Sequence, residues 1–319
     1  MKKLLITGFS GFVSRHFLDY LFENKLEFEI LGVDVTTPNF ACEKYSKILK
    51  IQYQKLNLLD KDAVDKTIME FKPDYVLHLA SFSSVSYSWK HPEECFFNNT
   101  HIFMNLTEAI RKNDLLDCRI LSVGSSEEYG NVPMDLLPLR EDMPLQPLNP
   151  YAVARVAQEN MAKVMTEGYG MKIILTRSFN HIGPFQDERF VIPSFVKRVL
   201  DVANTGASSG VIETGDVSII RDFLDVRDVV RAYYLLLTEG VSGQVYNVCS
   251  GKGTSLEAVL SMIADFAGLS IESKVNPDYV RPDENKVIIG SFDKLKNDLG
   301  WEPVISLEKT LQDIIDVMN

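Results

Sequence analysis

Short apolar runs alternate with longer amphipathic stretches through the first half of the chain. Strand-length apolar runs occupy residues 4–7, 28–35, 73–80, 119–123 and 171–177. Helical periodicity marks the stretches 62–71, 96–111 and 151–167. Runs that are apolar at nearly every position suit strands buried on both faces. Their alternation with helices predicts an α/β fold built on a doubly wound parallel sheet.

The second half of the chain is less regular. Glycine and serine punctuate residues 205–210 and 250–253, and residues 276–283 contain two prolines. We expect short helices and strands there, inserted between segments that return to the sheet.

Composition narrows the classes of partner. The chain has 319 residues, with 33 Lys plus Arg against 44 Asp plus Glu, which gives a formal charge of −11. This acidic balance argues against a nucleic-acid protein, because phosphate neutralisation needs clustered cations. We also expect no membrane association, because no apolar run approaches the length of a membrane span.

The four cysteines stand far apart, at Cys42, Cys95, Cys118 and Cys249. None has the spacing of a zinc site or a redox pair, so we expect reduced thiols, no metal and a cytoplasmic location. The first residues resemble a signal peptide only briefly, before Thr7 and Gly8 interrupt the apolar run.

A glycine-bearing turn connects the first strand to the first helix. In the segment Thr7–Ser14, Gly8 suits a tight turn and Gly11 allows the backbone to approach a pyrophosphate at the helix N-terminus. Ser14 occupies the third glycine position of this pattern. A simple strand–helix loop would show similar residues, so this turn alone is weak evidence for a dinucleotide site.

Asp34 strengthens the dinucleotide interpretation. It ends the second strand about twenty residues after the turn, where an acid can accept hydrogen bonds from the adenosine ribose. Because a carboxylate there repels a 2′-phosphate, the sequence favours NAD(H) over NADP(H).

Candidate catalytic residues follow the later strands. Tyr151 and Arg155 are separated by four positions at a helix start and therefore share one face. Ser125 and Glu127 follow a buried strand directly. The carboxyl ends of parallel strands form the ligand crevice of such sheets, so we expect these side chains near a bound nicotinamide.

Together these motifs resemble the extended short-chain dehydrogenase/reductases of the nucleotide-sugar type, the NAD-dependent epimerase/dehydratase family. The resemblance covers essentially the whole chain. Within the family it is strongest to the reductases and 4,6-dehydratases of GDP-linked sugars, through GSSEEYG, SFNHIGP and Arg281-Pro282. The motifs are TGFSGFVS (7–14), Asp34, HLAS (78–81), Asn99, GSSEEYG (124–130), Tyr151, RSFNHIGP (177–184), RDFLDVRD (221–228) and YNVCSG (246–251).

The resemblance implies a role for each catalytic candidate. Tyr151 would exchange a proton with the sugar oxygen at C4, and Ser125 would hydrogen-bond that oxygen. Glu127 would be an acid/base in a dehydratase, or a structural carboxylate in a reductase. The family has Lys where this chain has Arg155; either Arg155 fills the role imperfectly, the site has adjusted around it, or redox activity has been lost.

The resemblance also implies binding residues and an assembly. A Rossmann-type domain would span residues 1–176 and about 222–248, and a nucleotide-sugar domain about 177–221 and 249–319. The helices 96–111 and 151–167 would form a homodimer interface. Cofactor contacts would come from Gly8, Ser10, Gly11, Phe12, Val13, Asp34, Asp60, Leu79, Ala80, Ser81, Asn99, Tyr151 and Arg155. Substrate contacts would come from Ser83, Ser125, Ser126, Asn180, Lys197, Arg221 and Arg281.

Three functions remain open from the sequence. The first is hydride transfer at C4 of a GDP-linked 4-keto-6-deoxyhexose. The second is a 4,6-dehydratase or 4-epimerase with NAD. The third is a dinucleotide-binding sensor without turnover, which the departures at Ser14 and Arg155 keep open.

Overall fold

The computed structural model describes residues 1–280 and 285–319 of the chain. Its largest sheet has seven parallel strands in the order β10-β6-β5-β4-β1-β2-β3. This arrangement confirms the doubly wound parallel sheet expected from the sequence. The strands are β1 (Lys2–Thr7), β2 (Phe28–Asp34), β3 (Lys50–Lys55), β4 (Tyr75–His78), β5 (Arg119–Ser125), β6 (Lys172–Ser178) and β10 (Val245–Val248).

The apolar runs of the central strands are buried on both faces of this sheet. Along β1, Leu4 and Ile6 pack into the hydrophobic cluster on one face, whereas Leu5 packs into the cluster on the other. The edge strand β3 was not among the strands that the sequence predicted. Its sequence KIQYQK mixes apolar with polar and charged residues, because an edge strand is only partly covered.

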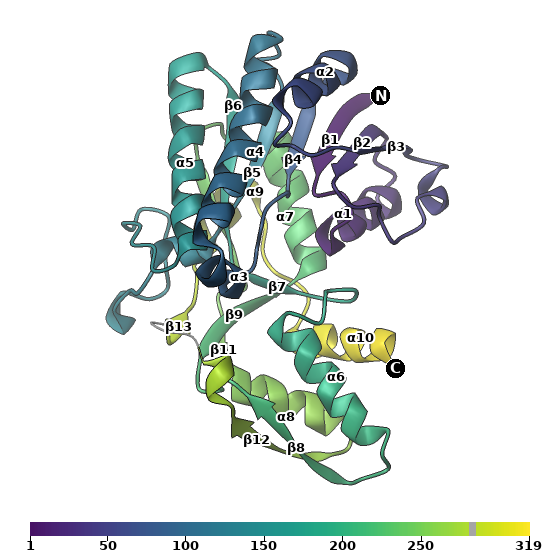
Figure 1. Cartoon of the computed structure of the whole chain (residues 1–319), viewed down its shortest axis with the longest axis vertical. Helices are drawn as coiled ribbons and strands as arrows, with labels where there is room; N and C mark the ends of the chain where they lie inside the picture. Colours follow the sequence, from purple (N-terminus) through teal and green to yellow (C-terminus); the bar gives the residue numbers. More distant parts are fainter. Residues whose placement is uncertain (281–284) are drawn as a thin grey trace.

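Helices cover both faces of the sheet (Figure 1). The helices α1 (Phe12–Glu23) and α7 (Val226–Glu239) pack together on one face. On the other face, α4 (Pro92–Lys112) packs between α2 (Lys61–Phe71) and α5 (Pro150–Tyr169). Shorter elements join them: α3 (Val85–Lys90), α9 (Asp293–Leu299), η1 (Glu43–Tyr45), η2 (Ser126–Tyr129) and η3 (Met134–Leu136).

A smaller lobe lies at one end of the large sheet (Figure 1). Its sheet is built on β9 (Ile220–Asp225), which pairs with β7 (Asn180–Ile182), β11 (Gly253–Ser255) and β13 (Val287–Ile288). A second sheet pairs β8 (Ser209–Thr214) with β12 (Ser270–Val275). The helices α6 (Val191–Ala203), α8 (Leu256–Phe266) and α10 (Leu307–Met318) share one apolar core, and η4 spans Pro277–Tyr279.

The chain passes between the two lobes more than once. It leaves the large sheet after β6, forms β7, α6, β8 and β9, and returns as α7 and β10. It then leaves again for β11, α8 and β12. Strand β9 lies outside the seven-stranded sheet, although residues 222–225 fall within the first of the two expected domains. The exact domain boundaries therefore stay a prediction.

Within the described ranges 1–280 and 285–319, no helix has the length and apolar character needed to cross a bilayer.

Candidate active site

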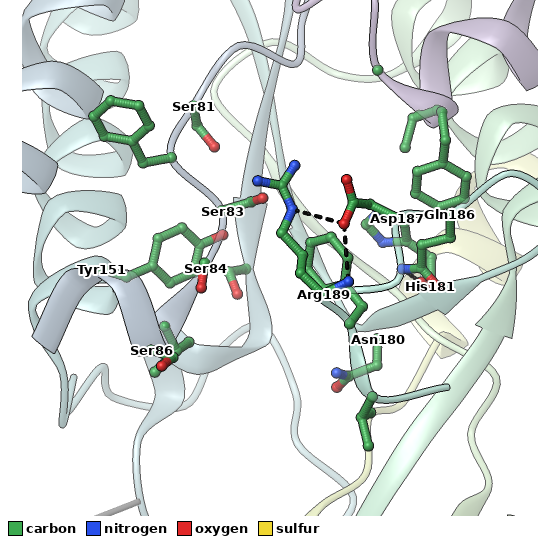
Figure 2. Close-up of a pocket in the computed structure, with 18 of the residues that line it drawn as sticks. Ser81, Ser83, Ser84, Ser86, Tyr151, Asn180, His181, Gln186, Asp187 and Arg189 are labelled. Atoms are coloured by element: carbon green, nitrogen blue, oxygen red, sulfur yellow. Dashed lines mark hydrogen bonds and ion pairs between the residues drawn. The ribbon is translucent and has the colours of Figure 1, made fainter. Parts of the chain in front are cut away.

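A cavity of about 1220 Å³ lies where the carboxyl ends of the large sheet meet the smaller lobe. The ends of β1 and β5 contribute Gly8 and Ser125, and the smaller lobe contributes Asn180 and Arg221. Figure 2 shows Tyr151 and a group of serines on one wall, facing Asn180 and His181 on the other. A ligand in the cavity can therefore contact residues of both lobes.

The turn between β1 and α1 has the geometry of a pyrophosphate cradle. Gly8 has a φ of +68°, and a Cβ added there would lie 2.8 Å from the backbone nitrogen of Ala80. Helix α1 begins after Gly11, so no side chain caps the N–H groups of its first turn. Ser14 is buried, and its hydroxyl donates to the Gly8 carbonyl at 3.2 Å. A dinucleotide pyrophosphate fits this cradle.

Asp34 is fixed on the cavity wall by the residues around it. Its Oδ2 accepts from the Ser10 backbone nitrogen at 2.9 Å and from the Ser10 hydroxyl at 2.5 Å. Its Oδ1 accepts from the Thr36 backbone nitrogen at 3.1 Å. These bonds hold a carboxylate beside the turn, where the adenosine ribose of a dinucleotide would lie.

The start of α5 places Tyr151 in the cavity. Asn149 caps the helix, because its Oδ1 accepts from the Ala152 backbone nitrogen at 2.9 Å, and Pro150 follows as the first helical residue. The same Asn149 side chain donates from Nδ2 to Glu127 Oε2 at 2.9 Å. Asn149 therefore ties the carboxylate of Glu127 to the helix that carries Tyr151, a link that the sequence interpretation missed. The Asn-Pro pair before an apolar helix is a readable capping signal.

Ser125 has a structural role and a place in the cavity at once. Its Oγ accepts from the Glu127 backbone nitrogen at 3.2 Å and so caps η2. Its own backbone nitrogen donates to Glu128 Oε1 at 2.7 Å. Because Oγ accepts in this cap, the hydroxyl proton can still be donated to a ligand oxygen.

Arg155 is anchored beside Tyr151. Its Nη1 donates to the Val123 carbonyl at 3.0 Å and to Gln158 Oε1 at 2.8 Å, and its Nη2 donates to the Ser81 hydroxyl. The guanidinium carbon lies 5.2 Å from the centre of the Tyr151 ring. A positive charge is therefore held next to Tyr151, as the family's lysine would hold one.

Residues 5–314 match the family described as GDP-mannose 4,6 dehydratase. The chain is 31% identical over 314 residues to GDP-6-deoxy-D-mannose reductase from Pseudomonas aeruginosa, covering 98% of this chain and 96% of that one. The chain belongs to the GDP-mannose 4,6-dehydratase family. This confirms the resemblance drawn from its motifs, and it makes the protein a member of a family of nucleotide-sugar enzymes.

Solved structures of related enzymes share the fold. The structure of RMD from Pseudomonas aeruginosa complexed with NADPH has a TM-score of 0.85 and 30% identity, and the match covers 100% of this chain and 99% of that one. UDP-glucose 4-epimerase from Thermotoga maritima, solved with UDP-glucose, has a TM-score of 0.86 and 27% identity, covering 99% and 98%. The Rossmann-type fold is thereby confirmed.

Most of the predicted site residues of this family member line the one cavity described above. Besides Gly8, Gly11, Asp34, Ser125, Glu127, Tyr151 and Arg155, they are Ser10, Phe12, Val13, Leu79, Ala80, Ser81, Ser83, Ser126, Asn180 and Arg221.

Three predicted contacts have other partners, and one cannot be placed. Asp60 caps α2 by accepting from the Ala63 backbone nitrogen at 3.1 Å. Asn99 is buried and holds Phe82, accepting from its nitrogen at 2.8 Å and donating to its carbonyl at 3.1 Å. Lys197 is exposed and pairs with Glu188. None of these three lines the cavity, and Arg281 lies outside the described residues.

The cavity also contains cations that the sequence interpretation did not select. Arg189 precedes α6 and extends toward the wall that carries Tyr151 and Ser83 (Figure 2). Asp187 orients it, with 3.4 Å between Asp187 Oδ1 and Arg189 Nε. Its position depends on the folded loop, and no local pattern marks it in the sequence. The others are Arg15, Lys90 and Arg198.

His181 lines the cavity as a neutral ring. It stacks on Phe12, with 5.8 Å between ring centres and 18° between planes, and burial lowers its pKa. Its Nδ1 lies 3.2 Å from the Phe179 carbonyl. These contacts give His181 a structural role in the cavity wall.

Glu128 is a fully buried carboxyl behind Ser125. Burial is the largest influence on its pKa, which it raises, and the nearby Glu159 raises it further. Among the residues that the structure describes, its Oε2 has no hydrogen-bond partner. The folded protein therefore favours the protonated form of Glu128.

We expect Glu128→Gln to stabilise the protein in a pH-dependent way. Because the pKa is raised in the folded state, the wild type loses stability as the pH rises from the unfolded pKa toward the folded one, and glutamine removes this loss. The variant should gain about 1–3 kcal/mol in unfolding free energy near pH 8 and much less near pH 5. Urea unfolding at both pH values measures the difference. An equal gain in unfolding free energy at pH 5 and pH 8 would show that ionisation of Glu128 does not lower the stability of the folded protein.

Proposed function

We propose that the protein reduces C4 of a GDP-linked 4-keto-6-deoxyhexose with a nicotinamide cofactor. The observation that carries this proposal is the placement of Ser125, Tyr151 and Arg155 in the cavity that also contains the β1–α1 turn. The relative from Pseudomonas aeruginosa with this activity is 31% identical over nearly the whole chain.

The side chains suit protonation of a ketone oxygen. When bound, the reduced cofactor supplies the hydride that adds to C4. The Tyr151 hydroxyl donates a proton to the C4 oxygen, which becomes the product hydroxyl, and Ser125 donates a hydrogen bond to the same oxygen. Arg155 holds a positive charge near the tyrosinate that remains, until solvent returns the proton.

The diphosphate of the substrate would lie at the smaller lobe. Arg221 lines the cavity from β9, and a guanidinium can bind phosphate oxygens in a bidentate way. Arg189 offers a second cation from the loop before α6. Lys197 stays a predicted contact, and in the structure its ammonium pairs with Glu188 on the surface.

A 4,6-dehydratase is the second candidate. Elimination of water across C5 and C6 needs an acid/base near those carbons, and Glu127 lines the cavity close to the start of α5. A 4-epimerase would use the same cofactor site without net reduction.

Two incubations separate the reductase from the dehydratase. The reductase predicts NADH consumption with the GDP-linked 4-keto-6-deoxy sugar and none with GDP-mannose. A keto sugar formed from GDP-mannose without net NADH change would establish the dehydratase instead. Cofactor binding without any absorbance change across a panel of nucleotide sugars would indicate the sensor.

We further propose that the cofactor is NAD(H), although the related RMD structure contains NADPH. Asp34 is held by Ser10 and Thr36 where a 2′-phosphate would meet its charge. We expect kcat/KM for NADH to exceed that for NADPH by about tenfold or more, and Asp34→Asn to narrow the ratio by relieving charge repulsion. Steady-state kinetics with both cofactors measures the ratio. A wild-type preference for NADPH would contradict this assignment.

We propose a homodimer through α4 and α5. These helices pack side by side, and they carry exposed apolar side chains at Phe96, Phe97, Val153 and Val164. Burying such a surface against a second copy would remove it from water. Light scattering should give twice the chain mass at micromolar concentration. A monomer mass there, unchanged on concentration, would contradict the dimer.

We also propose a cytoplasmic location. The four cysteines are free thiols, three of them buried, which suits a reducing compartment.

A further inference from the structure

The buried guanidinium of Arg155 is held entirely by uncharged acceptors. Arg155 as a whole is only 5% exposed. The three acceptors are the Val123 carbonyl, the Gln158 amide oxygen and the Ser81 hydroxyl. Both N–H groups of Nη1 are engaged by the first two, so that side of the planar head is fixed and Nη2 is directed to Ser81 and the cavity.

Gln158 is itself fixed from behind. It lies on α5, three residues after Arg155, and is 3% exposed. Its Nε2 donates to the Ser122 hydroxyl at 2.8 Å. Arg155 can only donate hydrogen bonds, so the amide must present its oxygen to Arg155 and its nitrogen to Ser122. Ser122 lies in β5, so the chain of hydrogen bonds ties the Arg155 head to the large sheet.

We propose that Gln158 is a positioning residue that orients Arg155 for the cofactor. A lysine ammonium is a compact charge, whereas the longer planar head of arginine must be held in one rotation to direct its free donors to a ligand. Gln158 and Ser122 supply that restraint. One N–H of Nη2 then donates to Ser81, which lines the cavity, and the other is directed to a ligand. The inference rests on the proposed function only in assuming that the cofactor binds beside Tyr151.

The test is a double-mutant cycle on NADH affinity. Gln158→Met keeps the side-chain volume and removes both hydrogen bonds. We expect it to weaken NADH binding, measured by the fluorescence of bound NADH, by about tenfold when Arg155 is present. In an Arg155→Met background it should change the affinity by less than about twofold. NADH binding stays measurable there because the β1–α1 turn and Asp34 still hold the dinucleotide.

Two further variants sharpen the cycle. Gln54→Met is the matched control: it also removes an amide-to-hydroxyl hydrogen bond, from Nε2 to Thr67 Oγ1 at 3.1 Å, but Gln54 does not line the cavity. It should leave NADH affinity unchanged. Ser122→Ala removes only the far anchor of Gln158 and should weaken NADH binding less than Gln158→Met does. Thermal unfolding of each variant checks that the fold is retained.

The outcomes are distinct. Equal losses of NADH affinity in the wild-type and Arg155→Met backgrounds, or no loss in either, would overturn the positioning role and leave Gln158 as a packing residue. A coupled loss supports it even if no nucleotide sugar is turned over, because NADH binding is measured without substrate. Failure of the proposed reaction and failure of this inference are therefore separable.

Discussion

We expect Tyr151→Phe to lower kcat by about 10²–10⁴-fold while NADH affinity stays within about twofold. The variant keeps the aromatic ring, which lies 5.2 Å from the Arg155 guanidinium carbon, and removes only the hydroxyl. Without that hydroxyl no protein group donates the proton to the C4 oxygen in the proposed way, and Ser125 can only hydrogen-bond it. Steady-state rates and NADH fluorescence titrations measure the two quantities.

The matched control is Tyr169→Phe, at the exposed end of the same helix. It should leave both quantities unchanged. Retention of more than about a tenth of the rate by Tyr151→Phe would show that another group protonates the substrate.

We expect Arg221→Met to raise KM for the nucleotide sugar by about 10–100-fold with a smaller effect on kcat. Arg221 lines the cavity from β9, and its Nη1 donates to the Ile220 carbonyl at 3.0 Å, which helps to orient the head. The diphosphate of the substrate lies far from the reacting carbon, C4. Losing the Arg221 contact with it should therefore weaken substrate binding more than it lowers kcat.

Lys252→Met removes an exposed cation outside the cavity and serves as the control, with KM unchanged. If Arg221→Met instead lowered kcat with an unchanged KM, the diphosphate would have to be placed elsewhere.

The central part of the fold was predictable because its signals are local. The runs at Leu4–Ile6 and in β5 are apolar on both faces, which only a fully covered strand requires. The edge strand β3 was not predicted, because it pairs with β2 alone and its sequence is rich in polar residues. The pairing of β9 outside the large sheet depends on contacts between distant segments and has no local signature.

The residues of the candidate site also differ in whether a local sequence pattern predicts them. Gly8, Gly11 and Tyr151 lie in short patterns whose geometry is set by neighbouring residues, and the structure brings all three to one cavity. Gln158 lies three residues after Arg155 on one helix, a spacing that the sequence shows, but its other partner, Ser122, is brought near only by folding. Arg189 reaches the cavity only through the folded loop before α6, so no spacing in the sequence identifies it.

The structure places some of the contacts that the resemblance alone implied outside the cavity. Asp60 caps a helix and Lys197 pairs on the surface, because residue type at a matching position does not fix the direction of a side chain. Asn99 holds the backbone of Phe82 and so shapes the cavity without lining it.

Transfer of deuterium tests the proposed reduction most directly. The protein is incubated with the GDP-linked 4-keto-6-deoxy sugar and NADH deuterated at both C4 positions of the nicotinamide, and the sugar product is analysed by mass spectrometry. The account predicts a product one mass unit heavier than that made with ordinary NADH, with the label at C4 of the sugar. An unlabelled product, or a keto sugar formed from GDP-mannose with no NADH consumed, would contradict it.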